Sequence, residues 1–206
     1  MADSFGGWKL DEPMTPEQFI ELLKSCYEAN DERLLRDHQR SLPFQDGVFD
    51  RWERARRLGF GERTSVYNSA AIFGSVKVGT DTWIGPNALL DGSGGRLDIG
   101  SFCSISSGVH VYTHDTVLWA LSGGALGRME GSVSIGDCVY IGSQSVVGAG
   151  VRIGSRCVVG ANSFVNEDIA DGTVVAGSPA RKIGVVLGRG DQVQMIFDSK
   201  NMHLKQ

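Results

Sequence analysis

The sequence predicts a mainly β protein whose central part is a parallel β-helix built from six-residue repeats. An aliphatic residue recurs at every sixth position and is followed by Gly in five of six cases. The position four residues further on is small or aliphatic each time. A helix repeats its apolar face every 3.6 residues and a half-buried strand every two, so a period of six fits three-sided coils with the aliphatic residues inside. We expect each Gly to relax the backbone at a corner. The six aliphatic positions are Ile135, Ile141, Val147, Ile153, Val159 and Val165.

The same spacing extends upstream and predicts a β-helix over residues 61–187. An insertion at Asp91–Arg96 breaks the register once. After a second interruption the pattern resumes at Ile135, 24 residues after Val111, and segment 113–132 keeps no repeat pattern. Long irregular segments in compact domains are usually functional, so we expect 113–132 to leave the prism as a loop. The earlier inward positions are Val66, Ile72, Val78, Ile84, Leu90, Ile99, Ile105 and Val111.

Residues 1–60 are helical in character. Thr15 precedes a Pro and stands three residues before Gln18, which is the pattern of a capping box at a helix start. Apolar residues then follow at helical spacing. A second, charged helix is expected at about 31–40 and a short third one at about 48–58.

Composition limits the classes of function. The chain has 206 residues, 28 of them Gly, and a net charge of −4 with both signs interspersed. This argues against nucleic acid or an anionic membrane surface as the main partner. No apolar stretch is long enough to span a membrane, and the start carries no evident secretory signal, so we expect a cytoplasmic protein. The four cysteines lack close spacing; Cys103 and Cys157 fall at inward positions as small apolar fillers. The tail, 188–206, shows no clear period.

His114 is the candidate for acid–base chemistry. It lies three residues after inward Val111, which turns it outward, and it stands at the mouth of the expected loop. A histidine placed there can act as a general base. The alternative is an ordinary surface histidine near a turn, and position alone leaves both open.

A resemblance favours the first interpretation. The stretch IGSFCSISSGVHVYTHDT, the irregular segment, and SIGDCVYIGSQSVVGAGVRIGSRCVVGANSFVNEDIADGTVVAGSPARKIG resemble the hexapeptide-repeat acetyltransferases over about residues 64–187. Galactoside, maltose and surface-polysaccharide O-acetyltransferases are nearest in pattern. The resemblance implies a left-handed β-helix, a homotrimer with sites between subunits, acetyl-CoA as co-substrate without a metal, and His114 as the catalytic base.

The resemblance also implies contacts with acetyl-CoA. Gly142 or Ser143 matches a coil corner whose backbone N–H stabilises the oxyanion, and Ser143 matches a CoA contact. Ala161 matches a small residue beside the pantetheine arm. Arg181 matches a basic residue that reaches the nucleotide phosphates, and Lys182 is a comparable candidate.

Other positions match less closely. The chain has Asn166–Glu167 where relatives often have Thr-Lys, which puts one phosphate contact in doubt. Asn87 and Asp91 match polar contacts to the acceptor, Trp119 is a candidate for stacking on a sugar or on CoA, and Asp115 is a candidate to orient the imidazole.

The expected activity is transfer of acetyl from acetyl-CoA to a hydroxyl of a sugar or glycan precursor. The main alternative is an N-acetyltransferase acting on an amino sugar nucleotide. A γ-carbonic-anhydrase-like metal enzyme is less favoured because it needs three His ligands, and only His110 and His114 lie in the prism. A catalytically silent scaffold is the remaining alternative.

Overall fold

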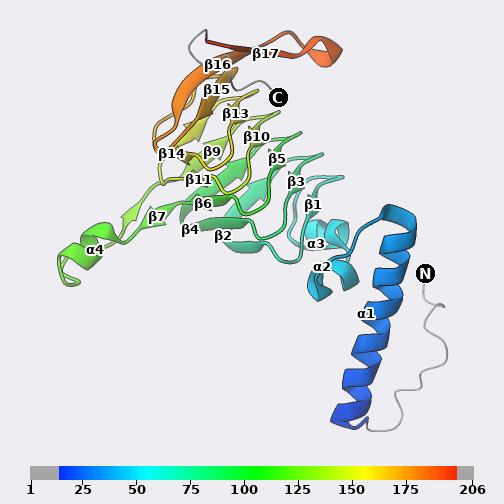
Figure 1. Cartoon of the computed structure of the whole chain (residues 1–206). Coiled ribbons are helices and arrows are strands. Elements are labelled where there is room, and N and C mark those ends of the chain that lie inside the picture. The colour runs from blue at the N-terminus through cyan, green and yellow to red at the C-terminus, as the bar shows by residue number, and fades with distance from the viewer. Residues whose placement is uncertain (1–13, 199–206) are drawn as a thin grey trace. The chain divides into compact units, whose positions relative to one another are not determined.

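The computed structural model describes residues 14–198, which divide into two compact units at Val48 and Phe49. Figure 1 shows the elements of both units in chain order. Within residues 14–198, no helix combines the length and the apolar character that a membrane crossing requires.

The first unit consists of helices α1 (Pro16–His38) and α2 (Phe44–Val48). The Thr15 side chain accepts from the Gln18 N–H, and the Gln18 side chain accepts from the Thr15 N–H, so the predicted capping box is present. The separate helix expected at 31–40 was wrong, because α1 continues through this segment. Residues 28–31 contain neither Gly nor Pro, so nothing in them interrupts the helix. The Tyr27 hydroxyl donates to the Leu42 carbonyl at 3.0 Å and ties the following chain back to α1.

The second unit begins with helix α3 (Arg51–Arg57), which packs on the first coil of the β-helix. Asp50 caps the helix by accepting from the N–H groups of Trp52 and Glu53. Ala55 is buried in the same core as the first coils. Arg54 donates to the carbonyls of Tyr67 and Ala70. The helix thus covers the first end of the β-helix.

The β-helix has three parallel walls. The first wall consists of β1 (Ser65–Val66), β3 (Trp83–Ile84), β5 (Ser104–Ile105), β10 (Tyr140–Ile141), β13 (Val158–Val159) and β15 (Thr173–Ala176). The second wall consists of the first parts of β2 (Ala71–Val78) and β4 (Leu89–Ile99), then β6 (His110–Tyr112), β11 (Val146–Val147) and β14 (Phe164–Val165). The third wall consists of the last parts of β2 and β4, then β9 (Val133–Ile135), β12 (Arg152–Ile153) and a bridge at Ile169. This architecture confirms the predicted β-helix.

The repeated aliphatic residues stack in register inside the prism. In the first wall the aligned Cα partners are Val66, Ile84, Ile105, Ile141 and Val159, and each is fully buried. Cys103 and Cys157 are also buried, as expected for inward positions. Each coil therefore buries its apolar residues against the coils above and below, which is the source of stability in repeat folds.

The reason for the repeated glycines differs from the prediction. Left-handed backbone occurs three residues after the aliphatic position, as at Cys138 (φ 57°) and Gln144 (φ 63°), and not at the glycine itself. A Cβ on Gly142 would lie 2.5 Å from the backbone nitrogen of Ala161 in the next coil. Most of the repeated glycines are therefore required by the close approach of successive coils, and they do not relax the corners. Gly148 is an exception, because a Cβ there would lie 3.5 Å from the Val165 carbonyl oxygen, an ordinary contact.

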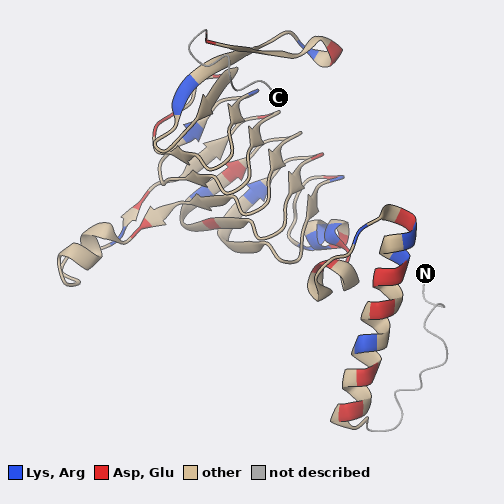
Figure 2. Ribbon diagram, viewed as in Figure 1, with Lys and Arg blue, Asp and Glu red and all other residues tan. Residues whose placement is uncertain are grey.

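Two segments depart from the prism. Between β6 and β9 the chain forms an antiparallel pair, β7 (His114–Asp115) and β8 (Met129–Glu130), with helix α4 (Val117–Leu121) beyond it. Figure 1 shows this pair and α4 projecting from the β-helix. At the C-terminal end, β16 (Arg181–Leu187), a 3₁₀ turn η1 (Gly190–Gln192) and β17 (Gln194–Phe197) extend the first wall with antiparallel strands. Figure 2 shows charged residues along α1 and only scattered ones on the β-helix.

Candidate functional site

The loop leaves the prism at the corner between the second and third walls. At this corner β4 carries a bulge, residues 93–96, because Gly74 pairs with Gly92 whereas Val76 pairs with Leu97. This bulge corresponds to the insertion at 91–96 that interrupts the six-residue repeat in the sequence. The strand that follows in the next coil leads through Thr113 into β7, so the bulge and the start of the loop lie against each other.

A buried threonine joins the bulge to the loop. The Thr113 side chain is fully buried, its hydroxyl donates to the Asp91 carbonyl at 2.8 Å, and it accepts from the Gly94 N–H at 3.0 Å. The returning strand is attached as well, because Arg128 donates to the Ser93 carbonyl at 2.9 Å. Both strands of the projecting pair are therefore fixed to the bulge.

This arrangement brings His114 and Asp91 together. His114 Nδ1 lies 3.5 Å from Asp91 Oδ2, and the two side chains are 22% and 10% exposed. The Ser93 N–H donates to Asp91 Oδ1 at 2.9 Å, and Ser93 Oγ lies 3.4 Å from His114 Nδ1. A carboxylate on the Nδ1 side favours the tautomer with hydrogen on Nδ1 and leaves Nε2 as the proton acceptor. A histidine whose Nδ1 faces a carboxylate can act as a general base through Nε2.

The two acidic residues near the imidazole differ in what their carboxylates contact. Asp115 Oδ1 accepts from the Val117 N–H at 3.0 Å, at the start of α4. The suggestion that Asp115 orients the imidazole was wrong, because its carboxylate is used in this turn and Asp91 holds the position beside Nδ1. Asp91 is only 7% exposed, which leaves it little surface with which to contact an acceptor.

Two pockets lie between the projecting pair and the C-terminal end of the β-helix, and we call them together the groove. Its first part is a pocket of about 230 Å³ at the base of β7 and β8, and its second part is a pocket of about 280 Å³ beneath β16. Asn166 lines both parts. The first is lined by Asp115, Met129, Glu130, Gly131, Gly148, Ala149, Gly150, Phe164 and Asn166.

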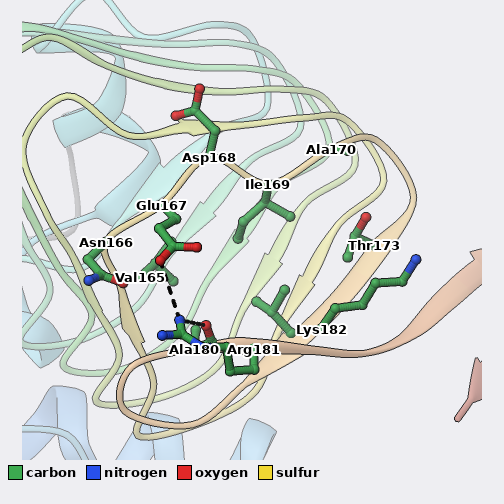
Figure 3. Close-up of a pocket in the computed structure, with 11 residues that line it drawn as sticks. Val165, Asn166, Glu167, Asp168, Ile169, Ala170, Thr173, Ala180, Arg181 and Lys182 are labelled. Atoms are coloured by element: carbon green, nitrogen blue, oxygen red, sulfur yellow. Dashed lines mark hydrogen bonds and ion pairs between the residues drawn. The ribbon is translucent and has the colours of Figure 1, made fainter.

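The second part of the groove holds the predicted basic residues. Arg181 Nη1 lies 3.7 Å from Glu167 Oε1 and donates to the Ala180 carbonyl at 2.8 Å (Figure 3). The Lys182 side chain lies on the side of the pocket nearer Thr173 (Figure 3). Glu167, the residue that departs from the pattern of the relatives, therefore opposes the cation expected to bind phosphate.

Four predicted residues lie on another edge of the prism. Asn87, Gly142, Ser143 and Ala161 all occupy the corner between the first and second walls. The Gly142 N–H donates to the Val159 carbonyl at 2.8 Å and is used in the ladder between coils. Of the two residues considered for the oxyanion, Ser143 is the one that remains a candidate.

The remaining candidates lie apart from this cluster. Trp119 is in α4 and is 54% exposed. His110 Nδ1 lies 3.3 Å from the Tyr112 hydroxyl on the second wall. Within residues 14–198, no group of three or more His, Cys, Asp or Glu side chains is arranged to hold a metal ion.

Sequence reasoning missed Ser93 and Arg128 as parts of this site. Ser93 lies in the insertion, where the six-residue period is lost. Without that period, the sequence does not indicate whether a side chain points inward or outward. The insertion itself could have indicated them. It interrupts one coil, and segment 113–132 interrupts the next coil, so the two irregular segments can contact each other. Arg128 lies in the segment without pattern.

Known proteins resemble the chain in both repeats and fold. The family model described as "Bacterial transferase hexapeptide (six repeats)" matches residues 132–167. A chloramphenicol acetyltransferase of Morganella morganii is 34% identical over 43% of this chain and 50% of its own length. Protein CapG of Staphylococcus aureus is 38% identical over 42% of this chain and 51% of its own. The chain thus spans about half the length of the curated relatives it matches.

Solved structures cover more of the chain. A hexapeptide-repeat acetyltransferase of Vibrio cholerae superposes with a TM-score of 0.59 at 28% identity, over 81% of this chain and 92% of that one. A single-residue variant of AntD, an N-acyltransferase of Bacillus cereus in complex with dTDP and coenzyme A, gives 0.54 at 26% identity, over 65% and 88%.

Proposed function

We propose that the chain transfers acetyl from acetyl-CoA to a hydroxyl of a sugar or glycan precursor, as its match to the hexapeptide transferase model and its likeness to a hexapeptide-repeat acetyltransferase suggest. The observation that carries this proposal is the pair of Asp91 and His114 at the loop corner. A hydroxyl is a poor nucleophile until a base removes its proton. The pair supplies a base whose ring orientation is set by a carboxylate.

His114 takes the proton from the acceptor hydroxyl through Nε2 as the hydroxyl oxygen attacks the thioester carbonyl carbon. The new C–O bond forms, the C–S bond breaks, and His114 returns the proton to the departing sulfur. Asp91 stabilises the positive imidazolium during the step. Acetyl-CoA supplies an activated acyl group, so the protein needs only to orient the reactants and move one proton.

The groove has a chemistry that suits a CoA molecule. Its first part, lined by Gly148 and Gly150, offers about 230 Å³ for the pantetheine chain, and its second part holds Arg181 and Lys182 for phosphate groups. The backbone N–H of Ser143 is the proposed donor to the carbonyl oxygen as negative charge develops.

Ser143 and His114 lie on different edges of one prism, so we propose that they meet in one site by coming from two subunits. The resemblance to the hexapeptide-repeat acetyltransferases, which implies a trimer, supports a homotrimer here. Sedimentation equilibrium of the purified protein tests this, and a monomer with full activity would contradict it.

Two observations favour a hydroxyl as the acceptor group. The site contains a candidate general base, and the curated relatives include chloramphenicol acetyltransferases. Chloramphenicol carries hydroxyl groups and no free amine, so an acetyltransferase named for it acts on oxygen. An amine of an amino sugar is already nucleophilic when neutral and gains less from a base. The similarity to AntD, an N-acyltransferase crystallised with dTDP, is the specific observation that favours the alternative, an amino sugar nucleotide.

Two measurements test the proposal. Calorimetric titration with acetyl-CoA should give saturable binding near one site per subunit. A panel of sugars, sugar nucleotides and amino sugar nucleotides should then yield an acetylated product from which mild base removes the acetyl group, as it does from an ester. A base-stable amide product would establish the N-transferase alternative. Absence of acetyl-CoA binding at millimolar concentration would contradict both.

A further inference from the structure

We propose that the β4 bulge, residues 93–96, sets the position of His114, and that Gly94 is the positioning residue on which this depends. The catalytic meaning of the inference rests on the proposed function, because His114 is the proposed base. The positional part concerns only the contact between two segments of the chain and can be tested without any acceptor.

Gly94 lies directly beneath the start of the loop. A Cβ built on Gly94 would lie 2.5 Å from the Thr113 carbonyl oxygen and would also overlap the Cβ of His114. Gly94 does not have a left-handed backbone, so the backbone itself accepts any residue there. Glycine is required because only its hydrogen leaves room for the backbone of residues 113 and 114.

Hydrogen bonds fix this close approach. The single hydroxyl of Thr113 accepts from the Gly94 N–H at 3.0 Å and donates to the Asp91 carbonyl at 2.8 Å. Thr113 has no exposed surface, so water cannot replace either bond. The residue before His114 is thereby tied to both ends of the segment that presents Asp91.

The returning strand of the loop is held to the same segment. Arg128 donates through Nη2 to the Ser93 carbonyl at 2.9 Å and through Nε to Glu130 at 2.6 Å. Glu130 is the cross-strand partner of His114 in the β7–β8 pair. The bulge therefore contacts the strand that carries His114 and the strand beside it.

Asp91 and His114 consequently share one support. Asp91 is oriented by the Ser93 N–H at 2.9 Å, within the bulge, and His114 rests on Gly94 in the same bulge. A methyl group at residue 94 would push the loop away from the bulge while Asp91 stays in β4. A displacement of about 1 Å is enough to cost roughly 100-fold in rate.

The decisive comparison is Gly94→Ala against Gly127→Ala. Gly127 is in the same loop, also lacks a left-handed backbone, and a Cβ there would have no heavy atom within 4 Å. We expect Gly94→Ala to lower kcat by about 10- to 100-fold with little change in the KM for acetyl-CoA. Gly127→Ala should keep the kcat and KM of the unmodified protein.

A second readout needs no catalysis. The rate at which diethyl pyrocarbonate modifies His114, followed by peptide mass spectrometry with His38 as the internal reference, reports how well the imidazole is held. The side chain is only 22% exposed, so we expect the relative rate to rise at least twofold in Gly94→Ala and to stay unchanged in Gly127→Ala. An unchanged relative rate in Gly94→Ala would overturn the inference.

Arg128→Gln is the second variant if Gly94→Ala does not fold, because this side chain is 42% exposed and its replacement leaves the buried core unchanged. It should raise the same relative rate, and an unchanged rate would count against the inference. A protein that modifies as expected but acetylates no acceptor would remove the proposed function and leave the positional inference standing.

Discussion

The carboxylate of Asp91 faces the imidazole of His114 across a corner of the β-helix, with Oδ2 and Nδ1 3.5 Å apart. The two residues belong to successive coils, since Asp91 and Tyr112 are Cα partners in neighbouring strands. The geometry exists because β4 gains a bulge in the coil directly before the one that opens into the loop. Two irregularities of the repeat thus produce one site, and the regular coils around them supply its rigidity.

His114→Ala should lower turnover by about two to four orders of magnitude, because it removes the proposed base and leaves binding and orientation in place. Steady-state kinetics with the identified acceptor measure the loss, and titration with acetyl-CoA should give nearly the same affinity as the unmodified protein. His38→Ala, in the first unit, is the matched control and should keep full activity. Full turnover in His114→Ala would exclude this mechanism.

Asp91→Asn preserves the shape of the side chain and removes its charge. The variant should lose about 10- to 100-fold in kcat, because an amide stabilises the imidazolium poorly and permits the wrong tautomer. Asp115→Asn should lose much less, since that carboxylate only accepts from the Val117 N–H at the start of α4. A larger loss in Asp115→Asn than in Asp91→Asn would reverse the assignment of the imidazole partner.

The repeat made the fold predictable, because a six-residue period has few structural solutions and the aligned aliphatic residues bury one another. The partner of His114 was not predictable in the same way. The insertion after Leu90 removes the register that tells inward from outward, so Asp91 was predicted only as an acceptor contact, and its place beside His114 Nδ1 was not predicted. The continuous α1 was missed because no Gly or Pro interrupts it at residues 28–31. The reason for the glycines was missed because it depends on how closely successive coils approach, which the sequence does not show.

Arg181 and Glu167 should have opposite effects on the binding of acetyl-CoA. Arg181→Gln removes a cation from the groove and should weaken binding, whereas Glu167→Gln removes the carboxylate 3.7 Å from that cation and should strengthen it. Both side chains are more than half exposed, so the changes should be about two- to tenfold and should shrink at high salt. Titrations at low and high salt measure them, with dephospho-CoA as the comparison ligand. Equal affinities for acetyl-CoA in the two variants would show that Arg181 and Glu167 do not contribute to phosphate binding.

Cys103 and Cys157 should resist alkylation in the folded protein at neutral pH. Burial raises the pKa of both thiols above the ordinary value, so each stays protonated, and the thiolate is the reactive form. Cys138 is exposed and should react. Iodoacetamide labelling followed by peptide mass spectrometry, before and after denaturation, provides the measurement. Labelling of Cys157 in the native protein at the rate of Cys138 would show that the coil around it opens readily.

The stability of the β-helix should depend on the inward residues and barely on their outward neighbours. Ile153 is 1% exposed inside the third wall, and Ile153→Ala should lower the free energy of unfolding by about 2–5 kcal/mol, since the stacked coils cannot close around the missing methyl groups. Arg152→Ala, one residue earlier on the exposed side of the same strand, should change it by less than about 1 kcal/mol. Urea unfolding followed by circular dichroism compares the two variants at one protein concentration. Equal losses would mean that the outward face of this wall contributes as much to stability as the core.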